Sequence, residues 1–303
     1  MDIISLLKNN QNINLYLHKI DYLSFEELSN MFSYILNNII SFASNPQSFL
    51  LINKIISLYN PNLSSQNEEK DNNVNEYIYS FLLSFFKKKI SFLIHSNNNN
   101  SNYISSIIYL IIKFGYPKND SIFIEIEQDF KIYAYNKQGS FLIQNIFPLG
   151  NVIQQQKLLN IILEQCDELI NDKYGHYLFK YLLYQAKNGE NYYYLIFSKI
   201  YNNIKNYSKK QYSSVIIERL LDSSNVNIIN KIIEKICIKE NDIIELLYSE
   251  YGNYILQKII YIIKDNNILG IIYKAIMSHK NTLNKLPYGK KIVKEIIAAY
   301  TLK

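Results

Sequence analysis

Three side chains that can hold a flat polar ligand lie within about one helical turn near the C-terminus: Asn253, Tyr254 and Gln257. The two amides each offer hydrogen-bond donors and an acceptor, and the phenol ring offers a face for stacking. Three upstream segments place hydrogen-bonding and mostly aromatic side chains at the same relative positions, which we number 0, +4 and +1. In that order they are Ser214, Glu218 and Val215; His176, Lys180 and Tyr177; and Ser140, Gln144 and Phe141.

These segments recur at a nearly constant interval. Position 0 falls at residues 140, 176, 214 and 253, with spacings of 36, 38 and 39 residues, and a fifth copy follows 37 residues later at Lys290. A period of this length is typical of solenoid proteins built from stacked helices. A glycine precedes position 0 in four copies, and Ser213 precedes it in the other. Because glycine permits positive φ and close backbone approach, we expect helix-capping corners between two helices there.

The positions of each copy fall on two opposite faces of the predicted helix. A helix turns about 100° per residue, so positions +2, +3, +6 and +7 form one stripe that we expect to be buried. These positions are apolar in all five copies. Positions 0, +1 and +4 lie on the opposite arc, which we expect to face solvent.

The period also predicts the domain organisation. We expect an all-α fold of six to eight units in one continuous domain, with clear repeats over residues 120–303 and degenerate ones over residues 1–119. Helices are expected over residues 23–43, 47–59, 76–94 and 103–114. Weak upstream copies begin near Tyr103 and Phe49, and polar insertions lie near residues 61–75 and 96–102.

Composition and charge favour a binding module over an enzyme. The net charge of +6 is a mild basic excess that suits a polyanionic partner. The four histidines are scattered, no Cys/His cluster has metal-ligand spacing and no glycine-rich phosphate loop occurs, so we expect no catalysis, metal or cofactor. Cys166 and Cys237 suit buried free thiols in a reducing compartment. No uncharged apolar stretch reaches membrane-spanning length, so we expect a soluble intracellular protein.

The motifs around Asn253, Ser214 and Ser140, in their order along the chain, closely resemble those of Pumilio (PUF) RNA-binding proteins. The segment from Tyr288 to Ile292 resembles the cap that follows the last repeat of that family. The resemblance implies a right-handed α-solenoid, a crescent of three-helix repeats in which the second helix of each repeat reads one RNA base. It also implies that C-terminal repeats read the 5′ end of single-stranded RNA.

The resemblance implies a base for three of the four segments. Asn253 and Gln257 match uracil, with Tyr254 stacking on it. Glu218 accepts only, so with Ser214 it matches the adjacent N–H donors of guanine. Val215 departs from the aromatic residue expected beside that pair.

The remaining two segments complete a predicted core of 5′-UGNA, which resembles UGUA. Ser140 and Gln144 resemble the adenine-reading pair of the family, with Phe141 as the stacking residue. His176 and Lys180, beside Tyr177, depart from the uracil pattern at the third base. Lys180 is as compatible with a contact to an RNA phosphate as with a contact to a base. An RNA-binding face predicts a basic track that includes Lys258, Arg219 and Lys180.

By the same resemblance, we expect a monomeric cytoplasmic protein that binds messenger 3′ untranslated regions. It would repress translation or mRNA stability by recruiting translational repressor or deadenylation proteins. Two alternatives stay open: a divergent nuclear or nucleolar relative that binds ribosomal precursor RNA, and a protein-binding solenoid of the HEAT or armadillo type.

Overall fold

The computed structural model describes residues 22–38, 50–51, 53–54, 120–186, 191–223 and 225–301. Every regular element within these ranges is a helix, so the all-α prediction is confirmed. The α-helices are α3 (Phe25–Asn37), α9 (Asp120–Gln128), α10 (Phe130–Ala134), α11 (Lys137–Ile146), α12 (Val152–Glu164), α13 (Cys166–Leu169), α14 (His176–Gln185), α15 (Tyr192–Ile200), α16 (Ile204–Tyr207), α17 (Ser213–Leu221), α18 (Val226–Cys237), α19 (Glu240–Leu247), α20 (Gly252–Ile262), α21 (Asn266–Ser278), α22 (Lys280–Leu283) and α23 (Gly289–Thr301). The short 3-10 helices η2 (Phe147–Leu149) and η4 (Tyr201–Asn203) follow α11 and α15.

The chain divides into two compact units, Met1–Ile161 and Ile162–Lys303. In the first unit, α10 packs against α9 and α11. A reciprocal cap opens α12, because the Asn151 side chain accepts from the Gln154 N–H at 2.9 Å and Gln154 Oε1 accepts from the Asn151 N–H at 2.8 Å. Gln154 Nε2 also donates to Asp120 Oδ1 at 2.6 Å, which ties the start of α12 to the start of α9.

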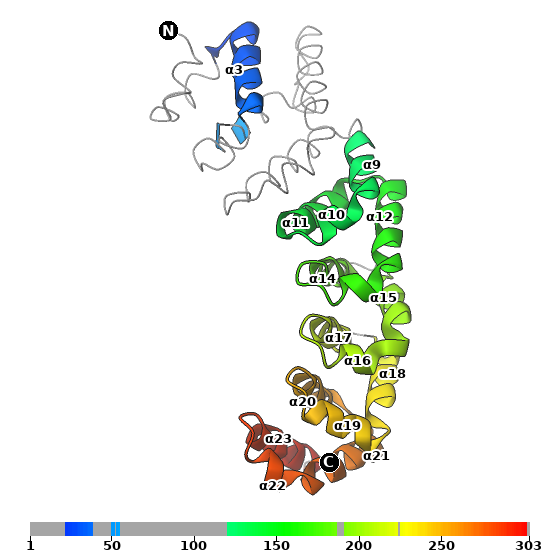
Figure 1. The fold of residues 1–303 in the computed structure, drawn as a ribbon. Helices are drawn as coiled ribbons and strands as arrows, with labels where there is room; N and C mark the ends of the chain where they lie inside the picture. The colour runs from blue at the N-terminus through cyan, green and yellow to red at the C-terminus, as the bar shows by residue number, and fades with distance from the viewer. Residues whose placement is uncertain are drawn as a thin grey trace. The chain divides into compact units, whose positions relative to one another are not determined.

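The second unit is built from stacked repeats. Helices α14, α17, α20 and α23 pack in that order, each against the next, and form one layer (Figure 1). On the other side, α15 packs against α14, α18 against α17, and α21 against α18 and α23. The short helices α16, α19 and α22 connect the two layers, so each repeat has three helices.

The apolar stripe predicted at positions +2, +3, +6 and +7 forms the core. In all five copies these side chains are buried, with the exception of the half-buried Ile297 near the end of the chain. Phe179 and Leu256, for example, are completely inaccessible to solvent. The burial of this stripe fixes the rotation of each helix about its axis, and thereby the direction in which positions 0, +1 and +4 lie.

The glycine corners are sites of close backbone approach. A Cβ added to Gly289 would lie 1.8 Å from the carbonyl oxygen of Leu283, six residues upstream, so only glycine fits. At Gly139 an added Cβ would lie 2.2 Å from the carbonyl oxygen of Tyr133, and at Gly175 and Gly252 its nearest neighbours would lie 2.8 Å away. None of these glycines has a positive φ, so close packing is the reason for glycine. In the remaining repeat, Ser213 Oγ donates to the equivalent carbonyl oxygen of Tyr207 at 2.8 Å.

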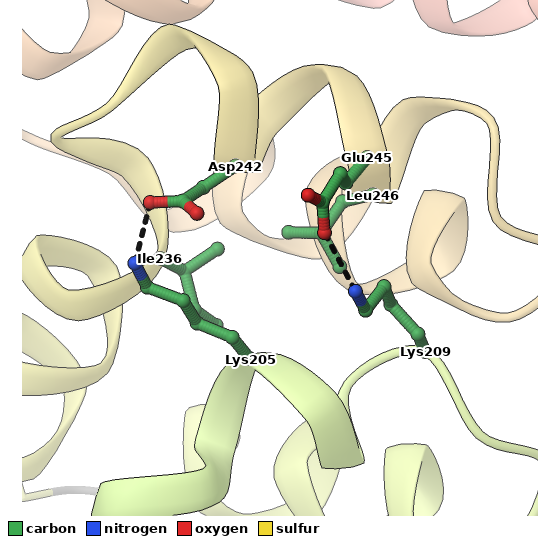
Figure 2. Close-up of a pocket in the computed structure, with 6 residues that line it drawn as sticks. All are labelled: Lys205, Lys209, Ile236, Asp242, Glu245 and Leu246. Carbon is green, nitrogen blue, oxygen red and sulfur yellow. Dashed lines mark hydrogen bonds and ion pairs between the residues drawn. The ribbon is translucent and has the colours of Figure 1, made fainter.

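Ion pairs connect neighbouring repeats along the connecting helices. Lys205 of α16 extends to Asp242 of α19, and Lys209 Nζ lies 2.6 Å from Glu245 Oε2 (Figure 2). One repeat earlier, the hydroxyl of Tyr207 donates to the carboxylate of Asp167. The two ion pairs are partly exposed to solvent, so each contributes little by itself to stability, whereas Tyr207 is buried.

Several sequence predictions can be compared with these elements. Helix α3 confirms part of the helix expected over residues 23–43. The expected helices at 76–94 and 103–114, most of that at 47–59, the weak copies near Tyr103 and Phe49 and both polar insertions lie outside the described residues. The division into clear and degenerate repeats, and the total of six to eight, therefore stay predictions.

Both cysteines are buried free thiols, as expected. Burial raises the pKa of each of Cys166 and Cys237 to about 12. Within the described part of the chain, no helix has the length and apolar character needed to cross a membrane.

Candidate functional site

Position 0 is buried in the first four copies. Ser140, His176, Ser214 and Asn253 are between 1% and 7% exposed. The expectation that this position faces solvent is therefore wrong. The angle of position 0 around the helix axis does not explain this burial. Position 0 lies in the first turn of the helix, and its side chain packs against the turn that precedes the helix.

In each of these four copies, the position 0 side chain hydrogen-bonds to a carbonyl group three or four residues upstream. Ser140 Oγ donates to Lys137 O at 3.2 Å, and Ser214 Oγ donates to Gln211 O at 3.2 Å. Asn253 Nδ2 donates to Ser249 O at 2.9 Å and to Glu250 O at 2.8 Å. The fourth case is His176 Nδ1 with Asp172 O, at 2.9 Å. Position 0 is thus fixed by the protein itself.

Asn253 also orients the side chain at +4. Gln257 Nε2 donates to Asn253 Oδ1 at 3.0 Å. One hydrogen of Gln257 Nε2 and the oxygen Oε1 remain for a ligand. The amide of Gln257 therefore offers one donor and one acceptor side by side, in an orientation set by Asn253.

His176 is held as a neutral ring. A carbonyl oxygen only accepts, so Nδ1 carries the hydrogen in its bond to Asp172 and Nε2 is the acceptor. Burial lowers the pKa of His176, which favours this neutral form. Its ring stacks on Tyr212 of the next repeat, with centroids 5.0 Å apart and planes inclined by 21°.

Tyr212 is a contact residue to which the sequence patterns assign no binding role. It lies two residues before position 0, where Tyr174, Tyr251 and Tyr288 lie in other repeats. That recurrence is visible in the sequence, but core packing is the role that it suggests. The tyrosines at 174, 212, 251 and 288 are half-buried, and Tyr212 contacts the site residue His176.

Positions +1 and +4 are open to solvent to different degrees. Tyr254 is 62% exposed, Phe141 47% and Tyr177 42%, while Val215 is half-buried. At +4, Glu218 is exposed, and Gln144, Lys180 and Gln257 are half-buried. In these four copies, positions +1 and +4 are therefore more accessible than position 0.

The predicted basic track is weaker than expected. Lys258 forms an ion pair with Asp222 of the preceding repeat, so its charge is partly neutralised. Lys180 Nζ lies 4.9 Å from the ring centroid of Tyr177, a cation–π contact within α14. Arg219 is exposed. The three side chains therefore differ in how far their positive charge is available to a ligand.

A model of the Pumilio-family RNA-binding repeat matches residues 133–163, 203–237 and 243–267. These three ranges contain α11, α17 and α20 with their position 0, +1 and +4 residues. Over these residues the chain matches the Pumilio-family repeat. Helix α14, with His176 and Lys180, lies between the matched ranges, in agreement with its departure from the family pattern.

Solved Pumilio-family structures share the fold. The Puf4 RNA-binding domain bound to an HO endonuclease RNA 3′ UTR recognition sequence is 19% identical, with a TM-score of 0.76 over 98% of this chain and 86% of that one. The RNA-binding domain of yeast Puf5p bound to SMX2 RNA is 20% identical, with a TM-score of 0.67 over 97% of this chain and 84% of that one. The predicted Pumilio-type solenoid is thereby confirmed as the fold.

A curated relative has a similar sequence over part of its length. The Pumilio domain-containing protein C6G9.14 of Schizosaccharomyces pombe is 24% identical over 191 residues, which are 61% of this chain. The chain spans only about a quarter of that relative, 26% of its length. Much of the relative therefore has no counterpart in the alignment with this chain.

Proposed function

We propose that this Pumilio-repeat chain binds single-stranded RNA with sequence selectivity, and that it prefers a core of 5′-UGNA. One observation carries the proposal: successive helices of the repeats present the same two accessible positions, +1 and +4, beside an anchored position 0. A protein-binding solenoid needs no such recurrent chemistry. The bound RNAs of the Puf4 and Puf5p structures support the same ligand class.

Helix α20 reads uracil in this proposal. Gln257 Oε1 accepts the uracil N3–H, and the remaining Nε2 hydrogen donates to an adjacent carbonyl oxygen of the base. Asn253 positions that amide through the 3.0 Å hydrogen bond. Tyr254 stacks on the base, a contact that contributes about 1–3 kcal/mol in comparable complexes.

Helix α17 reads guanine. The carboxylate of Glu218 is exposed and accepts from two adjacent N–H donors, which only guanine presents on its Watson–Crick edge. Ser214 Oγ keeps its lone pairs while it donates to Gln211, so it accepts a further hydrogen bond. Val215 packs on the base without aromatic stacking.

The third and fourth bases differ in how strongly they are specified. His176 offers Nε2 as an acceptor and Lys180 offers donors only. Because every base has both a donor and an acceptor on its Watson–Crick edge, this pair selects no single base, and the third base is written N. Gln144 Nε2 donates to Ser140 O at 3.0 Å, which fixes the amide beside Phe141. By resemblance, this pair reads adenine.

The proposed biological role rests on the resemblance to Pumilio proteins. We propose that the chain binds messenger 3′ untranslated regions in the cytoplasm and represses translation or mRNA stability, through repressor or deadenylation proteins that it recruits. The 3′ UTR sequence bound by Puf4 supports the target class.

Binding to short RNAs tests the proposal. The purified chain should bind an RNA with UGUA more tightly than one with ACUA, at the same length and at moderate salt. Equal affinity for the two RNAs would leave only charge attraction and reject base readout.

A further inference from the structure

Helix α23 continues the register of the base-reading helices with different chemistry. Its positions 0, +1 and +4 are Lys290, Lys291 and Lys294, and all three are exposed. They are the equivalents of Asn253, Tyr254 and Gln257 of α20, against which α23 packs. The resemblance to a terminal cap accounts for the packing of α23 but not for three lysines at these positions.

The positive charge of the whole chain is concentrated around this helix. Residues 279–303 contain six lysines and one acidic residue, Glu295. The chain as a whole has 32 basic and 26 acidic residues, which leaves 26 and 25 for residues 1–278. Those 278 residues are therefore almost neutral, and nearly all of the net charge of +6 belongs to the last helices.

The lysines are nearly free of carboxylate partners. Lys291 Nζ lies 3.7 Å from Glu295 Oε1, an exposed pair within one helix that solvent screens. Within the described residues, no carboxylate lies within ion-pair distance of Lys290 or Lys294. Lys280 and Lys285, on and after α22, are exposed as well and add to the same positive field.

Helix stability does not explain this arrangement. Lys290 and Lys291 lie in the first turn of α23, where the helix dipole disfavours cations. Lys290 and Lys294 are one turn apart, so their like charges repel. Lysines that are placed against the helix dipole and against each other indicate an anionic ligand.

Their chemistry fits a phosphate backbone better than a base. Lysine donates and never accepts, so it cannot distinguish bases as an amide or a carboxylate does. No aromatic residue occupies +1, and position 0, buried in the four upstream copies, carries an exposed ammonium group here. Long flexible stems let the three ammonium groups follow successive phosphates.

We propose that Lys290, Lys291 and Lys294 form a sequence-independent phosphate subsite for the nucleotides 5′ of the uracil read by α20. The inference rests on the proposed function and its strand polarity. The subsite extends the RNA contact by one repeat without adding a specified base.

The test compares RNAs with and without a 5′ extension of four nucleotides before UGUA. The wild-type chain should bind the extended RNA more tightly, and the triple variant K290Q/K291Q/K294Q should lose that gain while it keeps its preference for UGUA over ACUA. If two phosphates are neutralised, a slope of about −0.7 per phosphate predicts that the gain shrinks about sevenfold between 50 and 200 mM salt. Replacing the extension with neutral methylphosphonate linkages should remove the gain in the wild type.

A matched control variant is K199Q/K231Q/K274Q, which removes three exposed lysines from α15, α18 and α21. It changes the net charge equally and should keep the full gain. Thermal unfolding checks that the triple variant of α23 is folded, and it should be at least as stable as the wild type.

Three results would each overturn the subsite. The wild type and the α23 variant could gain equal affinity from the 5′ extension, neither could gain any, or the control variant could lose the gain as fully as the α23 variant. A wild-type chain that fails to distinguish UGUA from ACUA would instead overturn the proposed function.

Discussion

In the proposed function Asn253 connects the fold to base readout, so its replacement by alanine should damage both. The substitution removes two hydrogen bonds to the carbonyl groups of Ser249 and Glu250 and one from Gln257. Each bond contributes about 0.5–1.5 kcal/mol net, and the side chain is 1% exposed. We expect Asn253→Ala to lower the free energy of unfolding by about 2–3 kcal/mol, measured by urea denaturation.

Asn253→Ser separates the two roles. A serine at position 0 can donate to an upstream carbonyl, as Ser140 and Ser214 do, so it should cost only about 1 kcal/mol. The shorter side chain cannot orient Gln257. Both variants should therefore lose about tenfold of the preference for uracil at the first base, which corresponds to about 1.4 kcal/mol.

The control is Gln257→Ala, which should lose the same preference with little change in stability because Gln257 is half-buried. Fluorescence anisotropy with UGUA and AGUA RNAs measures the preference. Equal stability of the alanine and serine variants, or a serine variant that keeps the wild-type preference, would refute the reasoning.

Three further predictions concern stability. Burial lowers the pKa of His176, so below about pH 6.5 the unfolded chain takes up a proton that the folded chain does not. The free energy of unfolding should therefore fall as the pH falls below this value, and it should fall less in the variant His176→Gln. Gly289→Ala should destabilise the protein by about 1–3 kcal/mol, because the added Cβ clashes with the preceding helix. Gly270→Ala places the added Cβ where no atom lies within 4 Å, so it should stabilise the protein by about 0.5–1 kcal/mol. Chemical denaturation measures both changes. A double-mutant cycle on Lys209 and Glu245 should give about 0.2–1 kcal/mol, decreasing with salt; a larger value that resists salt would contradict a surface pair.

The core could be predicted from the sequence because burial follows the helical period. Leu142 and Ile255, for example, occupy the same position of their repeats and therefore the same angle on their helices. Both are buried, and their burial requires no knowledge of distant residues. The period alone therefore predicted the helix layer, the corners and the direction of positions +1 and +4.

The same angular reasoning failed for position 0. Asn253 lies opposite the apolar stripe, yet it is buried because its amide bonds to the preceding corner. A helical wheel represents one helix and leaves out the turn before it. The pairing of Lys258 with Asp222 was equally invisible, since a count of charges does not show which residues of neighbouring repeats meet.

The central claim is that positions 0 and +4 of each repeat select one base. The most direct measurement is the exchange of Ser214→Asn together with Glu218→Gln, which gives α17 the pair found in α20. Affinities should be measured for four RNAs that differ only at the second base, with the first-base preference as an internal control. The account predicts that the preferred second base changes from guanine to uracil, and an unchanged preference for guanine would contradict it.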